Sequence, residues 1–222
     1  MLALSTSLLI PSSAAFGETS STATSGPTEK ANYSKEYREK LDNMKPFIEA
    51  YDKDGNLIKS YSEEEINQLR KEIIAPGIYK EPKVDGTPFS ASYDANNNLI
   101  SSTDKNLQNS HRAALEKVKA AGLTVFNYPA AQFSNNIWVG GGRNFYKPQS
   151  VVVDAKKKFP LIAVRVIQGN SEAGSLKIGG FLGGVNVPVG QFTKSGGNYQ
   201  IQLKNLDPDG YTVYLNGGQV YY

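Results

Sequence analysis

The chain of 222 residues contains no cysteine and only one histidine. Without cysteine there is no disulfide framework, no thiolate metal site and no cysteine nucleophile. A single histidine also argues against a zinc site, because zinc in proteins takes most of its ligands from histidine and cysteine. The composition therefore excludes disulfide-stapled and zinc-centred domains.

The sequence also lacks the short motifs of common catalytic sites. His111 follows Ser110 in a stretch predicted to be helical, and adjacent positions on a helix do not face each other, so the two form no catalytic pair. No G-x-S-x-G occurs, and the glycine-rich segments 140–142 and 179–184 lack the Gly-Lys-Ser/Thr of a phosphate loop. We predict no catalytic residues and expect a protein that is not an enzyme.

The N-terminal apolar run, residues 2–10, is too short to span a bilayer. It has the length of the apolar part of a secretory signal, and small residues follow it up to Gly17, although no positive charge precedes it. We predict a signal peptide over 1–17, with a buried strand as the alternative. Residues 18–33 are rich in Ser and Thr and are predicted to be a disordered linker. We therefore expect a secreted protein, either free or associated with the cell wall.

The most informative feature present is a short internal repeat. Residues 46–60 recur 42 positions later as 88–102, and eight of the fifteen aligned positions are identical without a gap. Each copy places Asp and Asn between two β-type runs, which predicts a tight hairpin, and each then continues into a helical pattern. We expect two related hairpin-plus-helix units in region 34–122, with both hairpins in one small sheet.

Capping residues mark where the helices of this region begin. Ser34 precedes a helix expected over 35–44, which Pro46 ends. Ser62 and Glu65 have the spacing of a capping box ahead of the first repeat's helix, and Asp104 takes the equivalent place in the second copy.

From residue 123 onward the pattern changes to short β-type runs separated by Gly, Asn and Pro. Nine such runs in region 123–222 predict an antiparallel β-sandwich or jelly roll. Asn216-Gly217, between two aromatic runs, predicts a hairpin. The expected fold class is α+β, with a small repeat-containing region followed by a β-sandwich domain.

Charge is distributed unevenly between these two regions. Up to Gly122 there are 15 Lys and Arg against 17 Asp and Glu, whereas nine basic residues face four acidic ones from there on. A basic region suits an anionic partner such as a wall polymer or an acidic polysaccharide, and ordinary solubilising charge is the alternative. Lys156, Lys157 and Lys158 are expected on a hairpin tip as contacts for such a partner. We expect no nucleic-acid partner.

One cluster in the β-rich region predicts ligand binding. Trp138, Arg143, Asn144, Phe145 and Tyr146 surround a glycine turn. Aromatic faces stack on sugar rings, while Asn and Arg hydrogen-bond hydroxyls or anionic groups. Packing of the three aromatic rings in the core is the alternative interpretation.

The first copy of the repeat carries a weak calcium pattern. Asp52, Asp54 and Asn56 take positions 1, 3 and 5 of an EF-hand loop, but Leu57 stands where the sharp turn requires glycine. Asp and Asn are also preferred in tight turns, so we favour the hairpin interpretation and expect no cofactor.

These features predict a secreted, non-enzymatic binding or surface-associated protein whose basic β-rich half contacts a polysaccharide or an anionic cell-envelope polymer. Two alternatives stay open. One is a secreted hydrolase with an unrecognised carboxylate or serine site, for which Asp154 and Glu172 are the acids considered. The other is a structural or protein-interaction module of the extracellular matrix.

Overall fold

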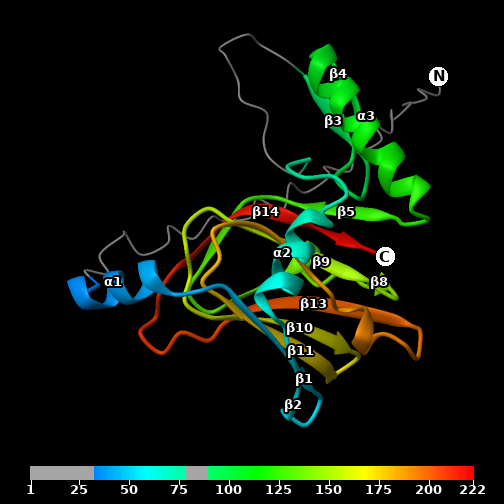
Figure 1. The fold of residues 1–222 in the computed structure, drawn as a ribbon. Helices are drawn as coiled ribbons and strands as arrows, with labels where there is room; N and C mark the ends of the chain where they lie inside the picture. Colours follow the sequence, from blue (N-terminus) through cyan, green and yellow to red (C-terminus); the bar gives the residue numbers. More distant parts are fainter. Residues whose placement is uncertain (1–32, 79–89) are drawn as a thin grey trace, which may run out of the picture. The chain divides into compact units, whose positions relative to one another are not determined.

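The computed structural model describes residues 33–78 and 90–222 (Figure 1). The predicted signal peptide and almost all of the predicted linker lie outside the described residues. The described part is α+β and mostly antiparallel sheet. Its helices are α1 (Lys35–Asn43), α2 (Glu63–Lys71) and α3 (Lys105–Ala120). None of these helices is long and apolar enough to cross a membrane.

The larger sheet has seven strands, all antiparallel to their neighbours, in the order β2-β1-β11-β10-β13-β7, with β8 also pairing with β13. Its strands are β1 (Phe47–Asp52), β2 (Leu57–Ser60), β7 (Asn136–Trp138), β8 (Phe145–Tyr146), β10 (Ile162–Gln168), β11 (Ser171–Gly179) and β13 (Asn198–Asn205).

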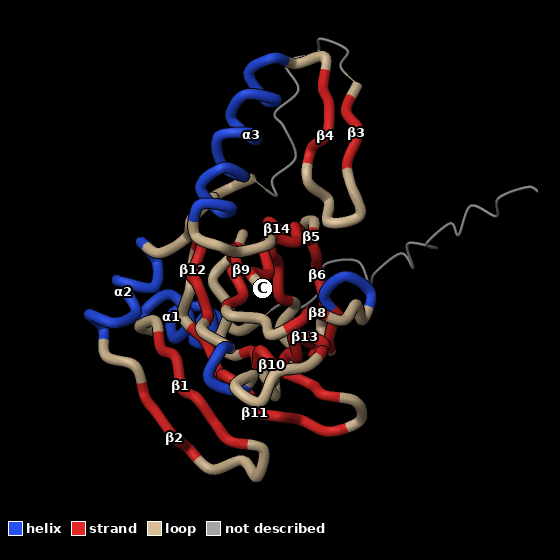
Figure 2. The backbone as a smooth tube through the Cα atoms, turned by 90° about the vertical axis from the view of Figure 1, so that its right-hand side faces the viewer, coloured by secondary structure: helices blue, strands red, loops and turns tan. Residues whose placement is uncertain are grey.

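A second sheet has the order β12-β9-β14-β5, and β6 also pairs with β14 (Figure 2). Its strands are β5 (Val125–Tyr128), β6 (Ala131–Phe133), β9 (Ser150–Ala155), β12 (Gly183–Val187) and β14 (Val213–Tyr221). The short hairpin β3 (Ala91–Tyr93) and β4 (Leu99–Ser102) forms a two-stranded sheet of its own.

The two larger sheets contribute to one buried apolar cluster. Val164 and Ile201 of the seven-stranded sheet and Val153, Val185 and Val220 of the five-stranded sheet are all fully buried in it. Successive strand residues point to opposite faces, so the alternate positions of the same strands face away from this cluster. These outward positions of the seven-stranded sheet carry the candidate site.

The predicted helix caps are confirmed. Ser34 and Ser62 each accept a hydrogen bond from the backbone N–H three residues later, and Ser62 and Glu65 complete a capping box. Asp104 caps α3 in the same way. These bonds satisfy N–H groups that have no partner within the helix, which explains why the helices begin there.

The two turns of the repeat have the same hydrogen bonds. Asp52 Oδ1 accepts bonds from the backbone N–H groups two and four residues later, and Asp94 Oδ1 does the same. Gly55 has φ 84° and Asn97, its counterpart 42 residues later, has φ 57°. Each hairpin also has its register shift at the same point, after residues 50 and 92.

The expectation that both hairpins share one sheet is wrong. β1 pairs with β11, so the first hairpin forms the edge of the seven-stranded sheet, whereas β3 pairs with β4 alone among the described strands. The first copy carries the apolar pair Ile48 and Ala50 on its core-facing side, but the second has Ser90 and Ser92 there. Burying the first hairpin therefore removes more apolar surface from water.

The predicted hairpin at Asn216-Gly217 is also wrong. β14 runs through these residues as one strand, with a register shift against β9 between Leu215 and Gly217. Gly217 has φ 111°, a conformation that suits glycine, and a Cβ there would lie 2.5 Å from the carbonyl oxygen of Tyr128. The glycines therefore serve a β-bulge and the close approach of β5.

Lys156, Lys157 and Lys158 do not lie on a hairpin tip. They follow β9 and precede β10, and these two strands belong to different sheets. The segment therefore connects the two sheets.

Candidate functional site

The predicted ligand cluster is arranged along β13. β7 places Trp138 opposite Gln202, and β8 places Tyr146 opposite Asn198 and Phe145 opposite Tyr199. Tyr199 is fully buried, whereas Asn198 is exposed and has the same parity on β13 as Gln202. Trp138 and Tyr146 therefore lie on the outer side of β13 and Phe145 lies on the core side.

The three aromatic residues differ sharply in exposure. Trp138 is 41% exposed and Tyr146 is 60% exposed, while Phe145 is fully buried with its ring centroid 5.4 Å from those of Phe126 and Tyr222. The two exposed rings are four β13 positions apart, about 13 Å along the strand. Phe145 supports this surface from the core and presents nothing to a ligand.

Arg143 contacts two other parts of the protein. Its guanidinium carbon lies 5.1 Å from the centroid of the Phe126 ring, and its Nη1 donates a 2.7 Å hydrogen bond to the carbonyl of Ala95 in the second repeat turn. Asn144 beside it is exposed. Arg143 thus fastens the β3–β4 hairpin to the five-stranded sheet, through Phe126 of β5.

The outer face of the seven-stranded sheet carries a straight row of residues that crosses it. We call Trp138, Gln202, Arg165, Ser175 and Tyr51 the transverse row, because each is the register partner of the next on strands β7, β13, β10, β11 and β1. Four strand spacings separate its ends, which amounts to about 19 Å. The two ends are aromatic and the middle is polar.

Hydrogen bonds join the middle of the transverse row. Arg165 donates from Nη1 to Oε1 of Gln202 and from Nε to Oε2 of Glu172, the latter at 2.6 Å. Gln202 in turn donates to Oδ1 of Asn136 at 3.2 Å. The Arg165 and Glu172 side chains are 30% and 24% exposed, so these two are accessible from solvent, whereas Gln202 is buried and holds Arg165 and Asn136 in place.

Tyr51 ends the row beside a cation and a carboxylate. The ammonium of Lys177 lies 3.9 Å from the ring centroid, and the Tyr51 hydroxyl donates a 2.6 Å hydrogen bond to Glu49. This bond to a carboxylate, more than burial, raises the pKa of Tyr51. Lys177 and Glu49 are also register partners on β11 and β1.

α2 contacts β12 and β1 and contributes Ile66 and Leu69 to the core, and α3 contacts β4. Figure 2 shows β1, β2 and β11 along the lower border with no described helix below them.

Sequence reasoning found Trp138 and Tyr146 but missed Gln202, Arg165 and Tyr51. The signal for Gln202 was present, since β13 alternates between polar and apolar residues, whereas Arg165 is a single polar residue among the apolar ones of β10. The order of the strands was needed to place them in one row with Tyr51, which precedes Trp138 by 87 positions.

The lysine segment lies elsewhere in the fold. The Lys157 ammonium is 4.3 Å from the ring centroid of Tyr214 on β14, and Lys158 donates a 2.6 Å hydrogen bond to the carbonyl of Asp42 in α1. Lys156 and Lys157 are exposed, whereas Lys158 is half-buried. Lys158 thus helps to hold α1, and Lys156 and Lys157 are the more accessible cations.

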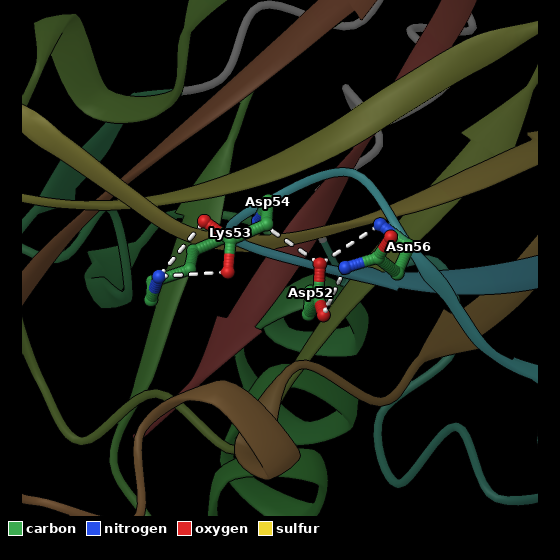
Figure 3. A network of polar contacts seen from close by, with 4 residues as sticks. All are labelled: Asp52, Lys53, Asp54 and Asn56. Atoms are coloured by element: carbon green, nitrogen blue, oxygen red, sulfur yellow. Dashed lines mark hydrogen bonds and ion pairs between the residues drawn. The ribbon is translucent and has the colours of Figure 1, made fainter.

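The carboxylates of the weak calcium pattern take part in the hairpin turn (Figure 3). Both oxygens of Asp52 accept hydrogen bonds within the turn, three in all, which hold its pKa below the ordinary value. Asp54 forms an ion pair with the Lys53 ammonium at 2.8 Å. Turn formation therefore accounts for these residue types. Within 33–78 and 90–222, no three His, Asp or Glu side chains gather into a group that could hold a metal.

The acids considered for a hydrolase lie in different sheets. Asp154 is buried on β9 and accepts a hydrogen bond from Asn216, while Glu172 is on β11 and pairs with Arg165.

The single histidine is buried inside the second repeat. His111 is 5% exposed, and its Nε2 accepts a 2.9 Å hydrogen bond from the backbone N–H of Leu99. Burial lowers the pKa of His111, and Asp94 opposes this shift. The bond ties α3 to β4.

Comparisons with protein-family models, with curated proteins and with solved structures found no match to this chain.

Proposed function

We propose that this protein is a non-catalytic binding protein that holds a polysaccharide or an anionic cell-envelope polymer on the outer face of the seven-stranded sheet. The observation that carries the proposal is the pair of exposed rings, Trp138 and Tyr146, on the same side of β13. Asn198, Gln200 and Gln202 lie between them on that strand. Flat rings flanked by amide groups suit sugar rings and their hydroxyls.

We also make two proposals about the architecture of the fold. We propose that the two larger sheets form a sandwich, which their shared apolar cluster supports, and that the two hairpin-plus-helix units arose by duplication, which the matching turns support. Three further proposals come from the sequence. We propose that the chain divides near Gly122 into a repeat-containing region and a β-rich region, and that residues 1–17 direct secretion. We also propose that Lys156 and Lys157 contact an anionic polymer.

The test is a binding panel with the full chain. Wild-type protein and the variants Trp138→Ala and Tyr146→Ala are incubated with insoluble cellulose, chitin and xylan and with soluble polygalacturonate. Tyr93→Ala is the matched control, because Tyr93 is 49% exposed and lies on β3, outside this surface. We expect each site variant to bind about tenfold more weakly, which corresponds to about 1.4 kcal/mol, and the control to bind like wild type.

Circular dichroism and melting temperature establish that the variants are folded. Unchanged binding of both site variants, or equal losses in the site variants and Tyr93→Ala, would overturn the proposal.

A further inference from the structure

We infer that the ligand of this sheet face is an uncharged polysaccharide chain that lies across the strands along the transverse row, from Trp138 to Tyr51. This inference rests on the proposed function and narrows it, because that function leaves both the charge of the polymer and its direction open.

The direction follows from the register of the strands. The transverse row passes through five strands without a register shift at any of its four pairings. An aromatic residue stands at each end, and the small side chain of Ser175 lies between Arg165 and Tyr51. A row about 19 Å long with rings at both ends fits an extended oligomer better than a single sugar.

The charge of the ligand follows from how the charged groups next to the row are compensated. Lys204, on the same side of β13 two positions from Gln202, forms no ion pair among the described residues and lies outside the row. Arg165 is neutralised by Glu172 at 2.6 Å, and its Nη1 is already used by Gln202. At the other end, Lys177 lies against the Tyr51 ring and opposite Glu49. An anionic ligand would have to displace Glu172 from Arg165 and would meet a second carboxylate in Glu49.

Hydroxyl groups need no such displacement. The half-buried amide of Asn136 provides a donor, and the carboxylate of Glu172 provides acceptors with spare lone pairs, while the buried Gln202 holds Asn136 and Arg165 in place. Hydrogen bonds among these groups fix their orientation before a ligand arrives, which lowers the entropic cost of binding. The surface therefore matches a neutral ligand rich in hydroxyls.

The test measures affinity against ligand length and ligand charge. Calorimetric titrations use neutral cello-, chito- and xylo-oligosaccharides from two to six units, together with polygalacturonate, at low and high sodium chloride. We expect affinity of the wild type to rise with length for one neutral series and to change less than about twofold with salt, since few ions are released. Tyr51→Ala is expected to weaken binding of the longest oligomer about tenfold and of the shortest hardly at all.

A second variant tests the role of charge pairing. Glu172→Gln keeps the shape of the side chain and one oxygen that can accept the Arg165 Nε–H bond, but leaves Arg165 without its counter-ion. We expect this variant to gain salt-sensitive binding of polygalacturonate that the wild type lacks. Leu182→Ala is the control, because Leu182 is 60% exposed and lies between β11 and β12, outside the row.

The outcomes separate this inference from the proposed function. Preference of the wild type for polygalacturonate with a steep salt dependence, no rise of affinity with length, or equal effects of Tyr51→Ala on short and long oligomers would overturn the inference. The proposed function would survive those results as long as Trp138→Ala still loses binding. If Trp138→Ala and Tyr146→Ala both bind like wild type, the inference and the proposed function are both overturned.

Discussion

His111 should make the stability of this protein fall at mildly acidic pH. Its Nε2 accepts the Leu99 N–H bond only when the ring is neutral, and burial lowers the pKa of the ring in the folded state. The unfolded chain has the ordinary value of about 6.5. Between the two pKa values the unfolded state binds a proton that the folded state does not, so the free energy of unfolding decreases as the pH falls. The contribution of His111 is complete above about pH 6.5 and is lost progressively below it.

The size of the effect follows from the geometry. A proton on Nε2 replaces an acceptor by a donor that faces the Leu99 N–H, a buried group that then has no partner. Such a loss costs about 1–3 kcal/mol. Each unit by which the folded-state pKa lies under the ordinary value contributes about 1.4 kcal/mol.

Two variants separate the effect of the histidine from that of Asp94, whose negative charge acts on it. His111→Gln keeps an acceptor for Leu99 but does not titrate, and His111→Leu reproduces Leu69, the residue at the equivalent repeat position. Urea unfolding at about pH 7.5 and about pH 5 gives the stability of each protein. We expect the wild type to lose stability relative to His111→Gln on acidification, and His111→Leu to be weaker at both pH values. The protection factor of the Leu99 amide against hydrogen exchange should fall at the lower pH only in the wild type.

A constant difference between wild type and His111→Gln, within about 0.3 kcal/mol at both pH values, would refute the reasoning. In that case the ring binds a proton equally well in the folded and unfolded states, so its neutral form does not hold the Leu99 amide.

Two glycine positions give further predictions. Gly218→Ala should cost about 1–3 kcal/mol in urea unfolding, because the new Cβ would overlap the backbone carbonyl oxygen of Val152 and the hydroxyl of Tyr128, whereas Gly141→Ala has open space and should cost about 1 kcal/mol through its positive φ alone. Equal losses of stability in Gly218→Ala and Gly141→Ala would contradict this interpretation of the packing around Gly218. In the first repeat turn, Gly55→Asn should stay within about 0.5 kcal/mol of wild type, since Asn97 adopts the same left-handed conformation in the second copy, while Gly55→Val should cost about 1–2 kcal/mol. Thermal melts of the two variants check this, and a Gly55→Asn variant as unstable as Gly55→Val would show that the two turns are not equivalent.

Local signals were sufficient where the chain satisfies its own backbone groups. Ser34, Ser62 and Asp104 bond to N–H groups within three residues, and Asp52 and Asp94 close their turns within four, so the neighbouring sequence determines these structures. The helix starts and both hairpins were predictable for that reason.

Local sequence patterns could not predict which strands pair over long distances in the chain. Gly217 has the sequence context of a hairpin, but it forms a bulge because β5 approaches it from one side and β9 continues on the other. The choice depends on partners about 60 to 90 residues away in the chain, which no local pattern specifies. The same holds for the transverse row, whose five members come from five strands.

The two repeat copies show how one local structure receives different roles from its surroundings. In the second turn, Asn97 donates to the carbonyl of Asn127 and Asn127 donates back to Asn98, so this turn is bound to β5. The first turn has Gly55 where the second has Asn97, and its strand β1 pairs with β11 instead.

That pairing is what brings Tyr51 to the transverse row, opposite Ser175. Tyr93, its counterpart in the second copy, is equally aromatic and 49% exposed but lies on the separate two-stranded sheet. If an aromatic residue after a β-bulge were enough for binding, Tyr51→Ala and Tyr93→Ala would weaken the binding of long oligosaccharides equally. If the transverse row is the site, only Tyr51→Ala will weaken this binding, because only Tyr51 shares a sheet with Trp138. The repeat thus supplies its own internal control for the proposed binding face.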